Sequence, residues 1–224
     1  MSYDGYERKH GKIKKRGLKK GDEMPIKRPA NPIKDKERIY DIQDYLKYKN
    51  GRDYILFILG ISTGYRAGDL VKLKVREVKE ALRVGYFLIL EGKKVNTKNI
   101  RKENIKPREA KIISKLNKEL REYIQDMKDF EYIFGSRKGK NQHINVSHVS
   151  RILQEAANNF GLNNITAHSM RKTYAYAIYV DSGYDIVAVK EMLGHSSIEI
   201  TKRYLGLDRE LYDKYSDKLN SLIR

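Results

Sequence analysis

Apolar positions recur at helical spacing from residue 35 onward. Asp35 is a candidate N-cap, the Asn-Gly pair at 50–51 is a candidate stop, and the apolar face between them consists of Ile39, Ile42 and Leu46. Residues 52–64 are apolar nearly all round, which is typical of a buried central helix. A further short helix is expected to begin at Arg66.

The next part of the chain favours strands. Residues 86–94 alternate, and one face of this strand holds Leu88 and Leu90. The polar, basic residues 95–105 then predict a hairpin. Pro107 can begin the following helix, whose inward face would consist of Ile112, Ile113, Leu116, Leu120 and Ile124. A third short strand is predicted at 132–134.

The C-terminal half is again helical in pattern. One apolar stripe is closed by Gly161 and consists of Val149, Ile152, Leu153, Ala156 and Phe160. Two more helices are predicted over 166–180 and 185–194, with N-caps at Thr166 and Asp185. Ser196 and Glu199 have the spacing of a capping box before the next helix. The predicted fold class is mainly α with a small antiparallel β-sheet (α+β).

The two ends of the chain differ from the rest. Residues 1–34 combine basic residues, glycines and three of the four prolines, so they are expected to form a flexible basic arm before a domain at 35–224. A helix at about 208–223 would end the chain, with an apolar stripe of Leu211, Tyr215, Leu219 and Leu222. Such a stripe needs a partner surface, either its own core or a neighbouring protomer.

Charge points to a polyanionic partner. The chain has 47 Lys and Arg against 29 Asp and Glu, a formal net charge of +18. This excess favours nucleic acid, because basic side chains that neutralise phosphates release counterions; a merely solubilising surface is the alternative. The longest apolar run, 54–61, is too short to cross a bilayer, no basic amphipathic helix suggests a membrane surface, and no signal peptide is visible. We therefore expect a cytoplasmic protein without a membrane partner.

Common catalytic signatures are missing. The absence of cysteine excludes disulfides and thiolate chemistry, and no Walker loop, dinucleotide fingerprint or His-Glu-x-x-His motif occurs. His143 and His148 lack carboxylate neighbours at ligand spacing, so no metal site is predicted.

Three short stretches could carry chemistry. In "STGYRAGDLVKL", Arg66 follows a glycine turn and Asp69 stands where it could hold the guanidinium or form an ordinary ion pair. In "AHSMRKTYA", His168 and Arg171 share a face at a helix start, where backbone N–H groups also favour an anion. In "GHSSIEITKRYL", Tyr204 follows His195 by nine residues.

Together these stretches strongly resemble the motifs of the tyrosine recombinase (phage integrase) family. "TGYRAGDLVKL" is similar to its first arginine box, "HSMRKTYA" to its His-x-x-Arg box and "LGHSSIEITKRY" to its last box with the nucleophile. The resemblance covers residue 35 to the end. It implies a tyrosine recombinase catalytic-domain fold in a single-domain form, like integrase-like recombinases of Gram-positive bacteria, their phages and mobile elements.

The resemblance assigns the following roles. Tyr204 would attack a DNA phosphate and form a 3′-phosphotyrosine, without a cofactor or metal. The phosphate would be held by Arg66, Arg171, His168 and His195. A hairpin lysine would protonate the leaving 5′-oxygen: strand alternation favours Lys94, and counting from the other side of the hairpin favours Lys98. Further DNA contacts are expected from Lys98, Arg101 and Lys172.

The family also implies partners and leaves alternatives open. Double-stranded DNA and a homo-oligomer on DNA, expected to be a tetramer with tails docked in trans, are the implied partners; accessory proteins are compatible with this. Nucleoid association would follow. Most integrases carry a separate core-binding domain before the catalytic domain, and here only the basic arm stands in that place. A type IB topoisomerase-like enzyme that nicks and reseals, or a non-catalytic DNA-binding relative, are the alternatives.

Overall fold

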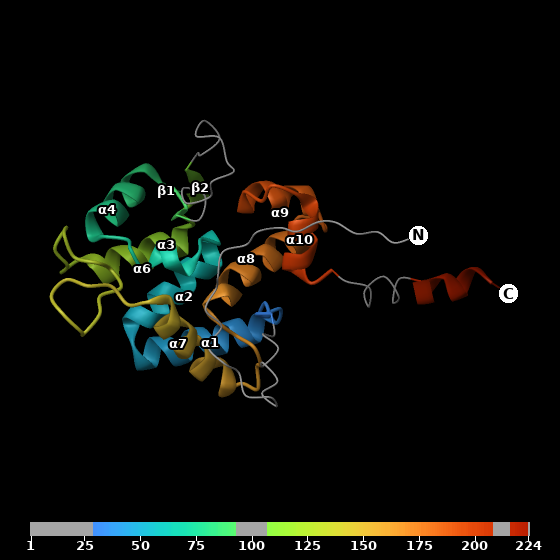
Figure 1. Ribbon diagram of the computed structural model, residues 1–224, viewed down its shortest axis with the longest axis horizontal. Helices are drawn as coiled ribbons and strands as arrows, with labels where there is room; N and C mark the ends of the chain where they lie inside the picture. The colour runs from blue at the N-terminus through green and yellow to red at the C-terminus, as the bar shows by residue number, and fades with distance from the viewer. Residues whose placement is uncertain (1–28, 93–106, 208–215, 224) are drawn as a thin grey trace, which may run out of the picture.

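The computed structural model describes residues 29–92, 107–207 and 216–223. These residues form a mainly helical body with one two-stranded antiparallel sheet (Figure 1), as the sequence pattern predicts. The elements, in chain order, are α1 (Lys36–Lys49), α2 (Gly51–Thr63), α3 (Ala67–Leu70), α4 (Val75–Val84), β1 (Tyr86–Ile89), β2 (Arg108–Lys111), α6 (Ser114–Ile124), α7 (Val146–Asn158), α8 (Ala167–Asp181), α9 (Ile186–Leu193), α10 (Ile198–Leu205) and the 3-10 helix η2 (Lys218–Leu222).

Helix α2 forms the centre of the main core, because it is apolar on nearly every side. It packs against α1, α6 and α8. Asn50 separates α1 from α2 and caps the second helix, since its side chain accepts a hydrogen bond from the Arg52 N–H at 3.0 Å. At the other end, Gly64 adopts the left-handed conformation and stops the helix. The predictions of a cap at Asp35 and of a buried central helix are confirmed.

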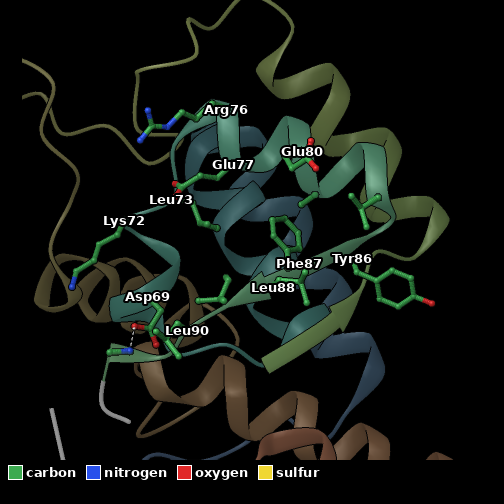
Figure 2. A pocket seen from close by; sticks show the side chains of 14 residues that line it. Asp69, Lys72, Leu73, Arg76, Glu77, Glu80, Tyr86, Phe87, Leu88 and Leu90 are labelled. Carbon is green, nitrogen blue, oxygen red and sulfur yellow. Dashed lines mark hydrogen bonds between the residues drawn. The ribbon is translucent and has the colours of Figure 1, made fainter. Parts of the chain in front are cut away.

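Strand β1 alternates as predicted, and the face that holds Leu88 is the exposed one. Phe87 is 1% exposed and pairs with Ala110 in the core, whereas Leu88 and Leu90 are 61% and 46% exposed. Between these leucines and α4 lies a groove with a volume of about 720 Å³ and basic and acidic rims (Figure 2).

The segment after Pro107 is a strand, so the prediction of a helix from this proline is wrong in its first turn. Arg108–Lys111 pairs with β1, and its backbone N–H and C=O groups therefore bond to the neighbouring strand instead of to a helical turn. Helix α6 begins only at Ser114, and Ile113 is its N-cap, 50% exposed instead of inward. The predicted hairpin at 95–105 lies outside the described residues.

Two further elements differ from the sequence pattern. Residues 132–134 form no third strand: Tyr132 makes only an isolated bridge to Lys74, and the next bridge joins Gly135 to His143. Helix α4 was not predicted, although its buried residues have helical spacing: Val75, Val78, Ala81 and Leu82.

Helices α9 and α10 pack with α8 around a second, smaller apolar cluster. Its buried members are Tyr174, Ala175, Val189, Leu193 and Leu205. The predicted caps Thr166 and Asp185 are confirmed. The predicted cap of α10 is off by one residue, because Ser197 rather than Ser196 accepts the hydrogen bond from Ile200 N.

The two ends of the described chain differ in burial. At the N-terminal end, Ile33 is 2% exposed and its N–H donates to the Thr173 hydroxyl on α8 at 2.8 Å. At the C-terminal end, Leu219 and Leu222 are 57% and 78% exposed, while Leu211 and Tyr215 of the predicted stripe lie outside the described residues. No helix in the described ranges is long and apolar enough to cross a membrane.

The turn at Gly64 gives a stability prediction. Gly64 has a φ of +64°, and an added Cβ would collide with the Tyr174 ring. We expect Gly64→Ala to lower the free energy of unfolding by about 1–3 kcal/mol, measured by urea denaturation. Gly51→Ala is the matched control, because Gly51 is helical and has open space around its Cβ position; it should be neutral or stabilising by up to about 1 kcal/mol. Equal effects of the two substitutions would contradict the role given to the turn.

Candidate active site

Arg66 stands on the turn that follows α2, and this turn is anchored from below by its neighbour in sequence. Tyr65 is fully buried, and its hydroxyl lies within hydrogen-bond reach of the Phe87 carbonyl (3.1 Å) and of the Arg108 carbonyl. Burial raises the pKa of Tyr65 to about 12, so it remains a neutral donor. The anchored tyrosine fixes the backbone of the turn against the sheet and thereby positions the side chain of Arg66.

Arg171 lies on the first turns of α8 and is 1% exposed. Its Nη1 donates to the Gly64 carbonyl (2.7 Å) and to Glu91 Oε1 (2.6 Å), and its Nη2 donates to the Leu193 carbonyl (2.8 Å). These carbonyls stand at the C-terminal ends of α2 and α9, where free carbonyl oxygens favour a cation. Burial lowers the pKa of Arg171, but only from its very high ordinary value.

Arg171 keeps donors for a ligand. A guanidinium carries five N–H bonds, and the Nε–H of Arg171 is buried without a partner among the described residues. An unsatisfied buried donor is costly, so this Nε–H favours an incoming oxyanion such as a phosphate.

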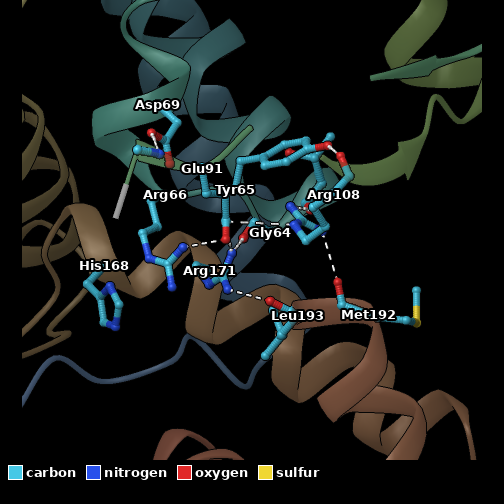
Figure 3. A network of polar contacts seen from close by, with 12 residues as sticks. Gly64, Tyr65, Arg66, Asp69, Glu91, Arg108, His168, Arg171, Met192 and Leu193 are labelled. Atoms are coloured by element: carbon cyan, nitrogen blue, oxygen red, sulfur yellow. Dashed lines mark hydrogen bonds and ion pairs between the residues drawn. The ribbon is translucent and has the colours of Figure 1, made fainter. Parts of the chain in front are cut away.

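Glu91 joins the two predicted arginines (Figure 3). Its carboxylate is fully buried: Oε1 accepts from Arg171, and Oε2 pairs with Arg66 Nη1. The predicted acidic buttress, Asp69, touches Arg66 only through a backbone hydrogen bond from its N–H to the Arg66 carbonyl (2.9 Å), and its carboxylate does not pair with the guanidinium. Instead Asp69 Oδ1 accepts from the Gly92 N–H at 3.0 Å, because the chain after β1 brings Glu91 closer to the guanidinium. A lone carboxylate at the start of the basic stretch 91–102 was the sequence signal for this residue.

Arg108 is a third buried guanidinium beside this pair, and the sequence pattern did not predict it. It is 6% exposed, its Nε lies 3.8 Å from Glu91 Oε1, and the guanidinium stacks on the Tyr65 ring at 3.8 Å. Nη2 donates to the Thr63 carbonyl (2.6 Å) and Nη1 to the Met192 carbonyl (3.0 Å). Arg108 thus bridges the same two helix ends as Arg171.

Tyr204 lies between two histidine rings. Its ring centroid is 4.9 Å from the ring centroids of both His168 and His195, and both pairs meet edge to face. The hydroxyl is 3.3 Å from His168 Nδ1. Helix α10 provides this placement: Ser197 begins it, Gly206 ends it in the left-handed conformation, and Leu205 is buried in the small cluster.

Burial dominates the acidity of Tyr204. It raises the pKa of the phenol to about 12, although the nearby guanidiniums of Arg171 and Arg66 favour the phenolate. At neutral pH Tyr204 therefore carries its proton, and reaction as a nucleophile requires a base. His168 Nδ1 is within reach of that proton.

His195 is held as a neutral ring. Its Nδ1 lies 3.0 Å from the hydroxyl of Thr201, which is fully buried. Burial, followed by the charges of Arg171 and Arg66, lowers the pKa of His195 to about 4. The ring can therefore form one hydrogen bond with Thr201 through Nδ1, which leaves its other nitrogen for a ligand.

The remaining predicted residues are partly described. Lys172 is only 9% exposed, and its Nζ lies 5.6 Å from the centre of the Tyr204 ring; burial lowers its pKa. Lys94, Lys98 and Arg101 lie outside the described residues. Within the ranges that the structure covers, no group of three or more His, Cys, Asp and Glu residues has metal-binding geometry.

The structure therefore brings the five predicted residues Arg66, His168, Arg171, His195 and Tyr204 to one place, from four separate segments of the chain. The arrangement combines a neutral phenol, imidazole nitrogens and two guanidiniums with free donors. These groups suit nucleophilic attack on a phosphate, in which a developing negative charge needs fixed donors. The groove of Figure 2 contains no such combination of groups.

Comparisons with known proteins agree with this chemistry. Residues 33–210 match the phage integrase family. The chain is 37% identical to the probable integrase/recombinase YoeC of Bacillus subtilis over 181 residues, which are 81% of this chain and 92% of YoeC. It is 30% identical to a tyrosine recombinase of Pseudothermotoga lettingae over 202 residues, 86% of this chain, and it spans 65% of that protein's length.

Solved structures share the fold. The crystal structure of XerA recombinase matches with a TM-score of 0.61 and 22% identity, over 85% of this chain and 66% of XerA. The Tn1549 transposon integrase in complex with transposon right end DNA matches with a TM-score of 0.60 and 14% identity, over 88% of this chain and 67% of the integrase.

The environment of His195 gives a pH prediction. We expect one of the five histidines to titrate near pH 4 in NMR spectra, and this signal to be absent from His195→Gln. The unfolded chain binds the proton near pH 6.5, so His195 contributes stability that is lost as pH falls from about 6.5 through 4. His195→Gln should accordingly show a shallower loss of unfolding free energy in this range. A His195 signal that titrates at or above pH 6.5 would contradict the buried, guanidinium-flanked ring.

Proposed function

The chain belongs to the phage integrase family, and we propose from this membership and its site that it is a site-specific DNA recombinase with Tyr204 as its nucleophile. The observation that carries the proposal is the position of the Tyr204 hydroxyl, 3.3 Å from His168 Nδ1 and beside the charges of Arg66 and Arg171. The resemblance to the tyrosine recombinases, first noted in three short motifs, is confirmed by the family match.

Cleavage follows from this arrangement. The Tyr204 oxygen attacks a backbone phosphorus, its proton passes to His168, and the bond from phosphorus to the 5′-oxygen breaks. The products are a 3′-phosphotyrosine and a 5′-hydroxyl. Attack by the 5′-hydroxyl of another strand reverses these steps and joins the new pair. The ester conserves the energy of the broken bond, so the chain's own residues suffice for rejoining.

Arg66 and Arg171 hold the non-bridging oxygens in this proposal. The Nε–H of Arg171 is available to a phosphate oxygen, and Arg66 keeps donors beyond the one used by Glu91. His195 adds the nitrogen that does not face Thr201. These groups are in place before DNA binds, so the charge that builds up on the oxygens meets donors that need little rearrangement.

A lysine from the segment between β1 and β2 is proposed as the general acid for the leaving 5′-oxygen. Lys94 is the first choice and Lys98 the alternative. Lys98, Arg101 and Lys172 are proposed to contact DNA. For Lys172 the position above the Tyr204 ring also places a positive charge beside the nucleophile.

Double-stranded DNA is the proposed partner, in line with the net charge of +18 and with the DNA-bound transposon integrase of the same fold. Strand exchange needs several protomers, and we assign this to a homo-oligomer, a tetramer on DNA, in which residues 208–223 dock on a neighbour. The exposed Leu219 and Leu222 support such a contact. Within the predicted arm, residues 1–34, Ile33 packs against α8, and the basic residues before it are proposed to contact the phosphate backbone.

The first test is the covalent adduct. DNA that becomes linked to the protein in cells is sequenced to define the site, and a nicked form of that site is then used to trap the adduct on a denaturing gel. We expect Tyr204→Phe to bind this DNA but to form no adduct, because only the attacking oxygen is removed. Tyr176→Phe is the control, since Tyr176 is a half-buried tyrosine on α8 whose ring faces Lys34 Nζ (5.1 Å) instead of the site. An adduct in Tyr204→Phe would remove Tyr204 from its role.

The second test identifies the general acid. Loss of a proton donor should slow cleavage by about 100-fold or more, and a 5′-bridging phosphorothiolate should restore it because sulfur leaves without a proton. We expect rescue of Lys94→Ala on the trapped site and only small effects of Lys98→Ala. Tyr204→Phe serves as the variant that no leaving group can rescue. Rescue of Lys98→Ala instead would transfer the role to that lysine.

A further inference from the structure

Two guanidiniums that must contact one phosphate repel each other when the site is empty. In this chain the negative charge of Glu91 offsets this repulsion, because one carboxylate oxygen contacts Arg66 and the other contacts Arg171. The carboxylate is fully buried and therefore weakly screened. It holds both arginines side by side before DNA arrives.

Arg108 connects Glu91 to the backbone at the ends of two helices. Its two terminal nitrogens donate to the Thr63 carbonyl, at the end of α2, and to the Met192 carbonyl, at the end of α9. The chain that follows α2 carries Arg66, and the chain that follows α9 carries His195. A single side chain thus fixes the two turns from which a guanidinium and an imidazole reach the site.

The net charge of the cluster is better balanced with a phosphate bound than without one. Three guanidiniums contact one carboxylate, which leaves a surplus of two positive charges. A phosphodiester carries one negative charge, and a second builds up on its oxygens as the phenolate attacks. The cluster is therefore best balanced when the pentacoordinate state forms. Without Glu91 the surplus would be three, and the guanidiniums would be driven apart.

We propose that Glu91 and Arg108 are positioning residues for strand cleavage, which act through Arg66, Arg171 and the two turns without contacting DNA. This inference rests on the proposed function, because it assigns the two residues to the same reaction. We therefore expect substitution of either residue to slow the cleavage of a charged phosphate more than it lowers the stability of the fold or the affinity for DNA.

The experiment compares two substrates and four variants. The substrates are the trapped site with its natural phosphate and the same site with a neutral methylphosphonate at the cleaved position. Glu91→Gln keeps the size and removes the charge; Arg108→Lys keeps the charge and removes the planar fork. Asp53→Asn and Arg52→Lys are the matched controls, because Arg52 and Asp53 form a largely buried ion pair, and Arg52 also donates to the Gly135 carbonyl, away from the cluster.

We expect Glu91→Gln and Arg108→Lys to cleave the phosphate about 10- to 100-fold more slowly at unchanged DNA affinity, somewhat less than the loss of a whole oxyanion donor. On the methylphosphonate the loss should be much smaller, so the ratio of the two rates falls. The controls should keep the wild-type ratio, even where urea denaturation shows an equal loss of stability.

The outcomes separate the two levels of the proposal. A wild-type ratio in folded Glu91→Gln and Arg108→Lys would overturn the positioning role alone; should Glu91→Gln fail to fold, the ratio of Arg108→Lys decides. If the wild-type chain itself formed no adduct at Tyr204 on the natural phosphate, the proposed function would fail, and this inference with it.

Discussion

The site depends on one buried carboxylate between two guanidiniums. Glu91 is fully buried and would be costly as an unpaired charge, and so would Arg171. Each charge offsets the cost of burying the other. The C-terminal carbonyls of α2 and α9 accept further hydrogen bonds from the terminal nitrogens of Arg171 and Arg108. The helices, the sheet and the glycine turns all contribute to this arrangement: Tyr65 anchors one turn against β1 and β2, and the left-handed Gly64 and Gly194 end the two helices whose carbonyls accept.

Local signals in the sequence predicted most of the helices and the five residues that the structure brings together in the candidate site. Caps at Asp35, Thr166 and Asp185 depend on neighbours within a few residues, so their patterns are visible in the chain. The errors at Pro107 and at 132–134 also have a local origin, since short segments there satisfy more than one pattern, and pairing with β1 decided the first case.

Glu91 and Arg108 could not be found in this way, because their contacts span long separations in sequence. The carboxylate meets guanidiniums that lie 25 and 80 residues away, and Arg108 meets a carbonyl 84 residues away. Asp69, three residues from Arg66, has the spacing of a local ion pair and was the wrong choice of partner. A buried charged residue in a strand, as Arg108 is in β2 opposite Ile89, becomes informative only once the register of the sheet is known.

Tyr204 and Arg66 stand on elements that belong to different apolar clusters. Arg66 follows α2 in the main core, whereas Tyr204 and His195 are carried by α9 and α10 around five buried side chains. A small cluster gives its helices a lower free energy of local opening than the central helix has. Local opening of α9 and α10 would therefore move Tyr204 and His195 away from Arg66 while the main core stays folded. The site can thus come apart in a protein that is otherwise folded. A ligand that contacts residues of both clusters, as a bound phosphate would, opposes that opening. Binding of DNA would therefore shift the population toward the conformation in which the site is assembled.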